Sequence, residues 1–513
     1  MQLGPFDRRK KLSRCQACAA SHLKCSGERP CASCARRGVA CSYAAARDGG
    51  GGPLILLERG RQQTSASWGA GRETQTARLQ RVVTPPGGLA DEQLRHVYFF
   101  DVFVRRNSFT GRARTCGDEV TALAERHSQQ GSHLYHAMLA LGARYAVQLH
   151  AADGPGGRSS GLLSALGHYS KAVSHLRLAL DAQARGKGGR RQQEQQRMCI
   201  LWTTLLLGLF EVSASDAHPT AQQTLTTLTP RTQLMNDATG AAWRQHIIHG
   251  TAQALAASGP SACRSGPGLA FFTQARVFEV CRTILFNEAT FLTEPEWVRL
   301  AREGLPGDDG RPLDSLLDIM VMCSRLRVRA GAFIEGQEAA PEMQADAEAR
   351  AIASDGHHLR EALRCWHEAY TAQSSKGVDA RGDSDSDSDG DASMLLARVF
   401  FAATSIYLSG IFDYSAAHWQ RLQLPAATLD AATVQQHVAC VLALTAAALE
   451  RSRLSPLLFL FPLRIAGARS RRQPRQQQRI TALLGRVAGD GFVVAATVGA
   501  ELRELWALAA GGE

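Results

Sequence analysis

The chain has 513 residues, which is enough for two or three domains at roughly 100–200 residues each. Hydrophobic residues make up 45% and charged residues 20% of the composition, which excludes a wholly disordered chain. The formal net charge is +11, and nine basic but only two acidic residues lie between Met1 and Tyr43. The first 43 residues therefore carry +7, the other 470 carry +4, and we expect an anionic partner for the N-terminal end.

The N-terminus predicts neither a secretory signal nor a membrane anchor. Its first residues, MQLGPFDRRKKLSR, have no apolar run after the charges. The stretch Met198–Phe210, taken as the longest uncharged apolar segment, has roughly half the length of a membrane span. We therefore expect a soluble, intracellular protein with no membrane partner. In a reducing compartment, clustered cysteines favour metal ligation over disulfides.

Six of the 13 cysteines fall close together near the N-terminus. They are Cys15, Cys18, Cys25, Cys31, Cys34 and Cys41. They form two copies of the spacing C-x2-C-x6-C, the second displaced from the first by 16 residues. A tetrahedral zinc takes four ligands, so one zinc would leave two cysteines unused and two separate sites would need eight. Six thiolates satisfy two zinc ions if two of the sulfurs bridge both metals.

The repeat indicates which sulfurs bridge, namely the first cysteine of each half, Cys15 and Cys31. Each metal would then take the two remaining cysteines of one half. The apolar residues of this stretch are mainly alanines, too few for a self-supporting core. Structural zinc contributes an apparent ~10–16 kcal/mol in small finger peptides, which can replace such a core. The predicted cofactor is therefore Zn²⁺, two ions per chain.

From about Arg14 to Tyr43 the chain resembles the fungal zinc binuclear cluster (Zn2Cys6) transcription factors. The likeness rests on the six-cysteine spacing, on Lys24 before the third cysteine, on Pro30 and on the ending Cys41-Ser42-Tyr43. The resemblance implies double-stranded DNA as the partner, the nucleus as the location, and a short helix after the second cysteine that enters the major groove. The alternatives are a zinc-stabilised protein-interaction module or a redox cysteine cluster.

The six residues AASHLK between Cys18 and Cys25 depart from the family pattern, because many relatives have three or four basic residues there. The small residues before His22 resemble those of the aflatoxin-pathway regulators, which usually have a basic residue at its position. A lysine can donate to N7 and O6 of guanine, and a flanking basic run suits both phosphate contact and nuclear import. The predicted DNA contacts are Lys24, His22, Ser21, Arg14, Lys10 and Lys11.

Residues 44–94 are rich in Gly, Pro, Gln and Ser, which predicts a flexible linker after a DNA-binding domain at 1–43. The linker lacks the sustained heptads of a coiled coil, so a homodimer would have to form in another way.

From residue 95 to 513 the apolar residues recur with helical periodicity. In one example, Leu313, Leu316, Leu317, Met320 and Val321 fall on one helix face. Similar faces occur at 133–149, 161–180, 198–212, 241–257, 269–286, 394–411, 432–449, 479–488 and 498–506. Strand patterns with hairpin signals are nearly absent. The predicted fold class is therefore mostly α, with a small zinc module and a large all-α regulatory domain.

Parts of this domain resemble the second type of fungal-specific transcription factor domain. The carriers are WRQHIIHG at 243–250, GP at 259–260, FLTEPEW at 291–297, and SPL and FPLRIAG within 455–467. The resemblance implies a regulatory domain with the transcription machinery or co-regulators as partners.

The run DSDSDSDGD at 383–391 predicts a disordered acidic insertion at 374–393. Its aspartates begin like a calcium-binding EF-hand loop from Asp385, but Leu396 stands where the bidentate glutamate should be, which argues against calcium.

Catalytic motifs are missing from the sequence, which has no G-x-S-x-G elbow, P-loop or H-E-x-x-H, so we expect no enzyme. His133 and His136 lie three residues apart without an evident third metal ligand, which predicts surface or core histidines. Five cysteines among apolar residues are predicted to lie in the core: Cys199, Cys281, Cys323, Cys365 and Cys440.

Together these features predict a fungal, sequence-specific DNA-binding regulator of RNA polymerase II transcription, serving a secondary-metabolite pathway by its subgroup likeness. The alternative is a zinc-stabilised interaction or corepressor protein with little DNA sequence preference.

Overall fold

The computed structural model describes residues 32–38, 92–110, 117–127, 132–149, 155–185, 190–212, 250–264, 266–303, 312–336, 342–376 and 387–510. The chain divides into two compact units, Met1–Arg72 and Glu73–Glu513. The described part of the first unit is one helix, α2, Ala32–Arg37, and the residue that follows it.

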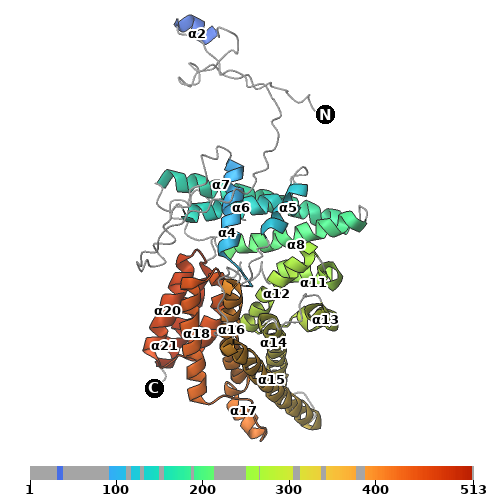
Figure 1. Cartoon of the computed structure of the whole chain (residues 1–513), viewed down its shortest axis with the longest axis vertical. Coiled ribbons are helices and arrows are strands. Elements are labelled where there is room, and N and C mark those ends of the chain that lie inside the picture. The colour runs from blue at the N-terminus through green and yellow to red at the C-terminus, as the bar shows by residue number, and fades with distance from the viewer. Residues whose placement is uncertain are drawn as a thin grey trace, which may run out of the picture. The chain divides into compact units, whose positions relative to one another are not determined.

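The described residues of the second unit form α-helices joined by turns and short 3-10 segments (Figure 1), which confirms the predicted all-α class. The α-helices are α4 (Glu92–Arg106), α5 (Gly117–His127), α6 (His133–Leu149), α7 (Pro155–Ala184), α8 (Arg190–Val212), α11 (Ala252–Ser258), α12 (Gly266–Phe286), α13 (Pro295–Glu303), α14 (Pro312–Gly336), α15 (Glu342–Lys376), α16 (Asp387–Asp413), α17 (Ala416–Arg421), α18 (Ala431–Arg451), α19 (Leu460–Ala468), α20 (Pro474–Gly489) and α21 (Val494–Ala510). The 3-10 segments are η4 (Pro260–Cys263), η5 (Phe291–Thr293) and η7 (Pro456–Phe459).

Helices α4 to α8 pack around α6, which contacts each of the other four. Leu134, Met138 and Leu141 of α6 are fully or almost fully buried. At Gly142 the backbones of α6 and α4 meet, since a Cβ there would lie 2.0 Å from the carbonyl oxygen of His96. This glycine sets the distance between the two helices.

Helix α16 is the centre of the remaining helices, and it packs against α14, α15, α17, α18 and α19. By length and composition, the stretch Ala392–Asp413 of α16 and the whole of α18 are apolar enough to cross a membrane. The uncharged run 399–412 within α16 is one residue longer than Met198–Phe210, so the prediction that Met198–Phe210 is the longest uncharged apolar stretch was wrong. The α16 window is 83% buried inside the protein, as in a core helix, whereas the α18 window is 39% buried.

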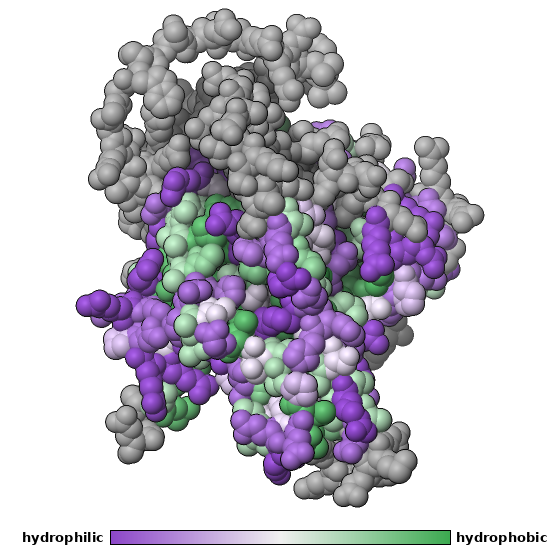
Figure 2. All heavy atoms as spheres, turned by 60° about the horizontal axis from the view of Figure 1, so that its bottom comes forward, coloured by the Kyte–Doolittle hydropathy of each residue, from purple (hydrophilic) through white to green (hydrophobic). Residues whose placement is uncertain are grey.

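The exposed positions of α18 are mostly alanines, at 431, 432, 439 and 443, which raise its hydropathy without forming a large apolar surface. On the face drawn in Figure 2, hydrophilic side chains project outward and hydrophobic residues lie between them in small patches.

The first and last parts of the second unit are joined by backbone hydrogen bonds. Ser108 N donates to the carbonyl oxygen of Arg453 at 2.8 Å, and Ser455 N donates to the carbonyl oxygen of Ser108 at 2.9 Å. The side chain of Gln148 donates to the carbonyl oxygen of Asp490 at 2.6 Å. A single hydrophobic core runs through the whole unit, for example where Trp202 of α8 packs edge-on against Phe271 of α12.

Most predicted helical segments coincide with helices, and for 241–257 the described part is helical from residue 250. Helix α15, which has 35 residues, was not predicted from the sequence. Its buried stripe includes Ala349, Ala353 and Gly356, and small residues give little hydrophobic contrast to the polar face. The absence of a side chain at Gly356 lets Phe412 of α16 pack close to α15, since a Cβ on Gly356 would lie 2.5 Å from the Phe412 ring.

The region predicted as a disordered acidic insertion, 374–393, is helical at both ends. Helix α15 continues to Lys376 and α16 begins at Asp387, while 377–386 lie outside the described residues. Negative charge is favourable near a helix N-terminus, so an acidic sequence can open a helix.

Four of the five predicted core cysteines are at least partly buried. Cys199 and Cys323 are buried, and Cys281 and Cys440 are half-buried. Cys365 is exposed, and its assignment to the core was wrong. Neighbouring helix positions point about 100° apart, so the buried Trp366 places Cys365 outside.

The FLTEPEW segment forms a turn and the start of α13. The Thr290 hydroxyl accepts a hydrogen bond from Leu292 N at the start of η5 and donates to the Glu279 carboxylate at 2.7 Å. Trp297, 2% exposed, stacks on Phe272. The segment therefore anchors α13 to α12.

Candidate metal centre and DNA interface

Helix α2 begins at Ala32, and Cys34, the second cysteine of the C-x2-C pair in the second half of the repeat, lies in its first turn. The helix has six residues and ends at Gly38, whose φ of +61° favours glycine and whose N–H donates to the carbonyl oxygen of Ala35 at 3.4 Å. An isolated helix of this length is not stable in water, so it needs support from its surroundings.

The side chain of Cys34 provides a test of whether the residues present suit a metal. Cys34 is 0% exposed, while the next three residues, Ala35, Arg36 and Arg37, are exposed. A sulfur turned inward from a short basic helix is the arrangement expected of a thiolate ligand, and the Cys34 side chain therefore fits zinc. The other predicted ligands, Cys15, Cys18, Cys25, Cys31 and Cys41, lie outside the described residues.

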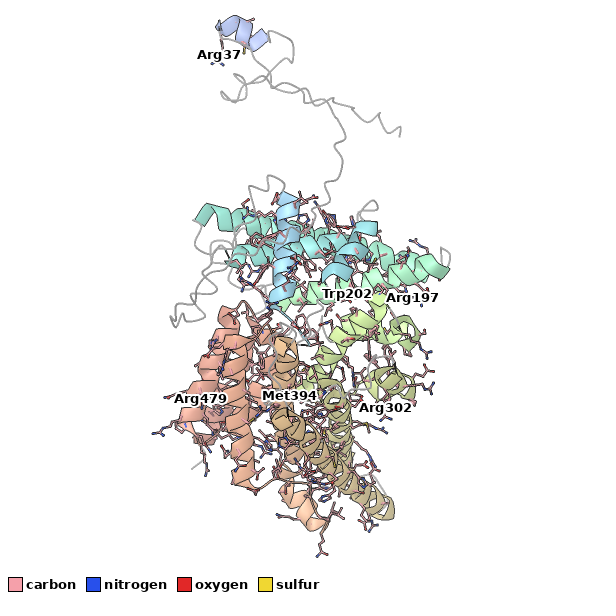
Figure 3. The ribbon with its side chains drawn as sticks, viewed as in Figure 1. Arg37, Arg197, Trp202, Arg302, Met394 and Arg479 are labelled. Carbon is pink, nitrogen blue, oxygen red and sulfur yellow. The ribbon has the colours of Figure 1, made fainter. Side chains whose placement is uncertain are left out.

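The predicted DNA-contacting residues, Lys24, His22, Ser21, Arg14, Lys10 and Lys11, also lie outside the described residues. The structure instead adds Arg36 and Arg37, which are exposed in the last turn of α2 (Figure 3 labels Arg37). A helix C-terminus favours positive charge. The sixteen-residue repeat aligns these arginines with Ala20 and Ser21, so the second half carries basic residues that the first half lacks. Comparing the two halves for charge would have found them.

His136, one of the two histidines singled out in the sequence, lies in a group of four histidines from α4, α6 and α7. Its Nδ1 is 3.2 Å from Nδ1 of His168, its ring centroid is 5.4 Å from that of His175, and the centroids of His96 and His168 are 5.7 Å apart. Burial is the main cause that lowers the pKa of both His136 and His168 to about 4, and the neighbouring histidines add to it. The two imidazoles are therefore neutral at pH 7.

Within the ranges that the structure describes, no group of three or more His, Cys, Asp or Glu side chains could hold a metal ion. His136 is half-buried at a helix interface, a position that agrees with the prediction of a surface or core histidine.

Buried charges in the helical unit pair with one another. Arg276, 2% exposed, contacts Asp318 at 2.6 Å, and Arg282 forms two 2.8 Å hydrogen bonds to Glu279. Burial raises the pKa of the Cys323 thiol to about 12, so this sulfur is not a thiolate at neutral pH. These groups support the packing of helices.

Comparisons with known proteins match both parts of the chain. The fungal Zn(2)-Cys(6) binuclear cluster domain matches residues 14–49, which contain all six clustered cysteines, and the fungal specific transcription factor domain matches residues 98–513. A transcription factor of Pseudocercospora fijiensis (strain CIRAD86) is 54% identical over 48 residues, which are 9% of this chain and 11% of that protein. The match thus spans about a tenth of the relative's length. No solved structure matches the chain.

Proposed function

We infer that this chain, which belongs to the fungal transcription factors that join a Zn(2)-Cys(6) cluster to a fungal specific transcription factor domain, binds promoter DNA in the nucleus. Two zinc ions would fold the module whose side chains contact the DNA. Zinc binding, DNA binding and transcription regulation follow from the family. The number of metals, the nuclear location and the action on RNA polymerase II genes are the proposal.

The buried Cys34 on a short basic helix supports this function most directly, because it places a sulfur where the repeat requires a ligand. In the proposed centre Cys15 and Cys31 would bridge the two metals. Cys18 and Cys25 would complete the ligands of one metal, and Cys34 and Cys41 those of the other. Six thiolates and two Zn²⁺ add −2 to the +7 of residues 1–43, so the module keeps a charge of about +5 and can still approach DNA.

The charged residues of the module divide into two proposed roles. Lys24 donates to a guanine edge in the major groove, with Ser21 and His22 beside it. Lys10, Lys11 and Arg14 contact phosphates. The exposed Arg36 and Arg37 add phosphate contacts from the second half of the repeat.

The helical domain has a regulatory role in this proposal, with co-regulators or the transcription machinery as partners. The matched families are generally non-enzymatic, which agrees with the expectation of no catalysis. The likeness of the AASHLK segment to aflatoxin-pathway regulators supports a secondary-metabolite pathway as the target.

A DNA selection experiment on the full chain tests the proposal. The purified protein is incubated with a random duplex pool, once with zinc and once after chelation, and zinc per chain is measured in parallel. We expect one enriched motif with zinc and none without it. Two bound zinc ions with no enriched motif would favour the alternative, a zinc-stabilised interaction or corepressor protein.

The same selection on His22→Arg tests the role of the unusual AASHLK segment. An imidazole has a shorter reach than a guanidinium and is mostly neutral near pH 7, so we expect the arginine variant to sharpen the preference for guanine at one motif position. An identical motif would show that His22 does not contact bases.

A further inference from the structure

A second concentration of positive charge lies near the C-terminal end of the helical domain. Between Arg451 and Gly489 the sequence contains nine arginines and no aspartate, glutamate or lysine. The net charge of +4 outside the first 43 residues conceals this segment, because acidic residues elsewhere offset it.

Three of these arginines are held by acidic partners. Arg464 contacts Glu501 at 3.1 Å, Arg469 contacts Asp413 at 2.6 Å, and Arg486 contacts Glu450 at 3.4 Å. These three stabilise contacts between helices.

Four others form an exposed group at the start of α20, which we call the arginine surface: Arg471, Arg472, Arg475 and Arg479. All four side chains are exposed, and none has an ion-pair partner among the described residues. Figure 3 shows Arg479 on the outer side of α20. Arg475 and Arg479 are four residues apart and therefore share one helix face.

The turn that carries this surface is held rigidly from within. Ser470 Oγ donates to the Ala466 carbonyl oxygen at 2.9 Å or to Gln476 Oε1 at 2.7 Å. Gln477 Nε2 donates to the carbonyl oxygens of Ser470 at 2.9 Å and Arg471 at 3.0 Å. The backbone is therefore fixed before any ligand binds, which reduces the entropy cost of binding.

The arginine surface is electrostatically unfavourable when it faces water alone. Its charges repel one another, and they lie at the N-terminal end of α20, where the helix dipole is also positive. A bound anion would reduce both the repulsion between the arginines and their repulsion by the positive end of the helix dipole.

We propose that the arginine surface binds the phosphate backbone of duplex DNA beside the site read by the zinc module. Guanidinium groups suit phosphate oxygens because of their planar donor fork, and duplex DNA carries one charge per about 1.7 Å of its axis. This inference rests on the proposed function, since the zinc module delivers the DNA. As a flexible chain, the predicted linker 44–94 would span about 40 Å, or about 12 base pairs, and would give the second contact a high effective concentration.

The composition of the surface favours DNA over an acidic protein. Protein interfaces usually contain a buried apolar or aromatic anchor. No exposed large apolar side chain lies between Arg471 and Arg479, where arginines and glutamines predominate. Phosphate contacts need only charge and hydrogen-bond donors.

The test compares the full-length protein with a variant in which all four arginines of the surface become glutamine. A control variant carries Arg177→Gln, Arg325→Gln, Arg350→Gln and Arg421→Gln, four exposed arginines on other helices, so its net charge is the same. Affinity is measured from 50 to 200 mM salt on a short duplex with only the selected motif and on a long duplex with about 20 flanking base pairs on each side.

Each phosphate contact contributes about −0.9 to the slope of log affinity against log salt. On the long duplex we expect the arginine-surface variant to have a slope shallower by about 1.8 if two arginines bind and by about 3.6 if all four do. With four contacts, the wild type loses about 150-fold more affinity than the variant over this salt range. On the short duplex the two proteins should agree, and the control variant should match the wild type on both.

Equal slopes for wild type and arginine-surface variant on the long duplex would overturn the proposal. A second result would also overturn it. If the four arginines increase the affinity for a fluorescent oligo-glutamate peptide by a larger factor than they increase the affinity for the long duplex over the short one, the surface would be assigned to an acidic protein. The Cys31→Ala variant separates failure of the proposed function from failure of this inference. If it retains motif-specific binding, the proposed role of the zinc module is wrong, whereas the arginine surface is tested by the salt slopes of the wild type and the arginine-surface variant on the long duplex.

Discussion

Single residues decide how closely the helices of this domain approach. Gly142 allows the backbones of α6 and α4 to touch, because a Cβ would lie 2.0 Å from the His96 carbonyl oxygen. Gly331 of α14 has nothing within 4 Å of the equivalent position. The two glycines look alike in the sequence, since each lies inside a helical pattern, and only the packing distinguishes them.

We predict opposite effects for alanine at these two positions. Gly142→Ala should lower the free energy of unfolding by about 2 kcal/mol or more, because α4 must move away from α6. Gly331→Ala should raise it by about 0.5–1 kcal/mol through helix propensity. Chemical denaturation of both variants measures this, and a Gly142→Ala protein as stable as the wild type would show that the contact is loose.

The bridging role of Cys31 gives a second prediction for a single residue. A lost bridging sulfur deprives both metals of a ligand, so Cys31→Ala should retain at most one zinc per chain, against two in the wild type. Cys365→Ala, which removes an exposed thiol from α15, should retain both. Elemental analysis decides, and two zinc ions in the Cys31 variant would refute the bridging assignment.

Among the secondary-structure elements, helices were predicted well from the sequence where large apolar residues recur every three or four positions among polar ones. Helix α14 was predicted from a face of five apolar residues, and all five are buried: Leu313, Leu316, Leu317, Met320 and Val321. Helix α15 was missed because alanines and a glycine form part of its buried stripe. The group around His136 was also missed, because its members come from three helices and only tertiary packing brings them together.

This histidine group predicts how the stability of the helical unit depends on pH. The folded-state pKa values of His136 and His168, about 4, lie below the usual 6.5, so the unfolded chain binds more protons between pH 6.5 and 4. Stability is therefore fully present above pH 6.5 and falls as the pH is lowered through this window, by at most about 1.4 kcal/mol per pH unit for each histidine.

Denaturation of a His136→Gln, His168→Gln double variant between pH 7.5 and 4.5 measures the effect. We expect a flatter dependence of the free energy of unfolding on pH than in the wild type. His358→Gln, which replaces an exposed histidine of α15, is the control and should follow the wild-type curve. Parallel curves for all three proteins would show that the buried pair titrates normally.

For the whole molecule, the part of the site that depends on metal could be predicted from spacing alone. A repeated cysteine spacing indicates metal ligands directly, since the sulfurs that bind one zinc ion must come close together in the fold. The arginine surface could not be predicted in this way, because five other arginines share its segment and only the structure shows which of them are paired. The exposed pair Arg36 and Arg37 was not predicted but could have been, since the sixteen-residue repeat aligns these arginines with the uncharged Ala20 and Ser21.

The division into two units predicts that zinc removal acts on one of them. The helical unit, Glu73–Glu513, has its own hydrophobic core, so chelation should abolish DNA binding and leave the main thermal unfolding transition unchanged. Circular dichroism at 222 nm measures the transition, and a shift of several degrees after chelation would contradict the independence of the core.

The hydrogen bonds of Ser108 with Arg453 and Ser455 also have a consequence during synthesis on the ribosome. Because 346 residues separate Ser108 from Leu454, which it bridges, translation at about 5–20 residues per second delays this pairing by roughly 17 to 70 s. Throughout that interval the nascent helices α4 to α8 lack the later segments that cover their apolar surfaces. The cysteine module is synthesised before the helical unit, so its metal can be loaded while that unit is still being made.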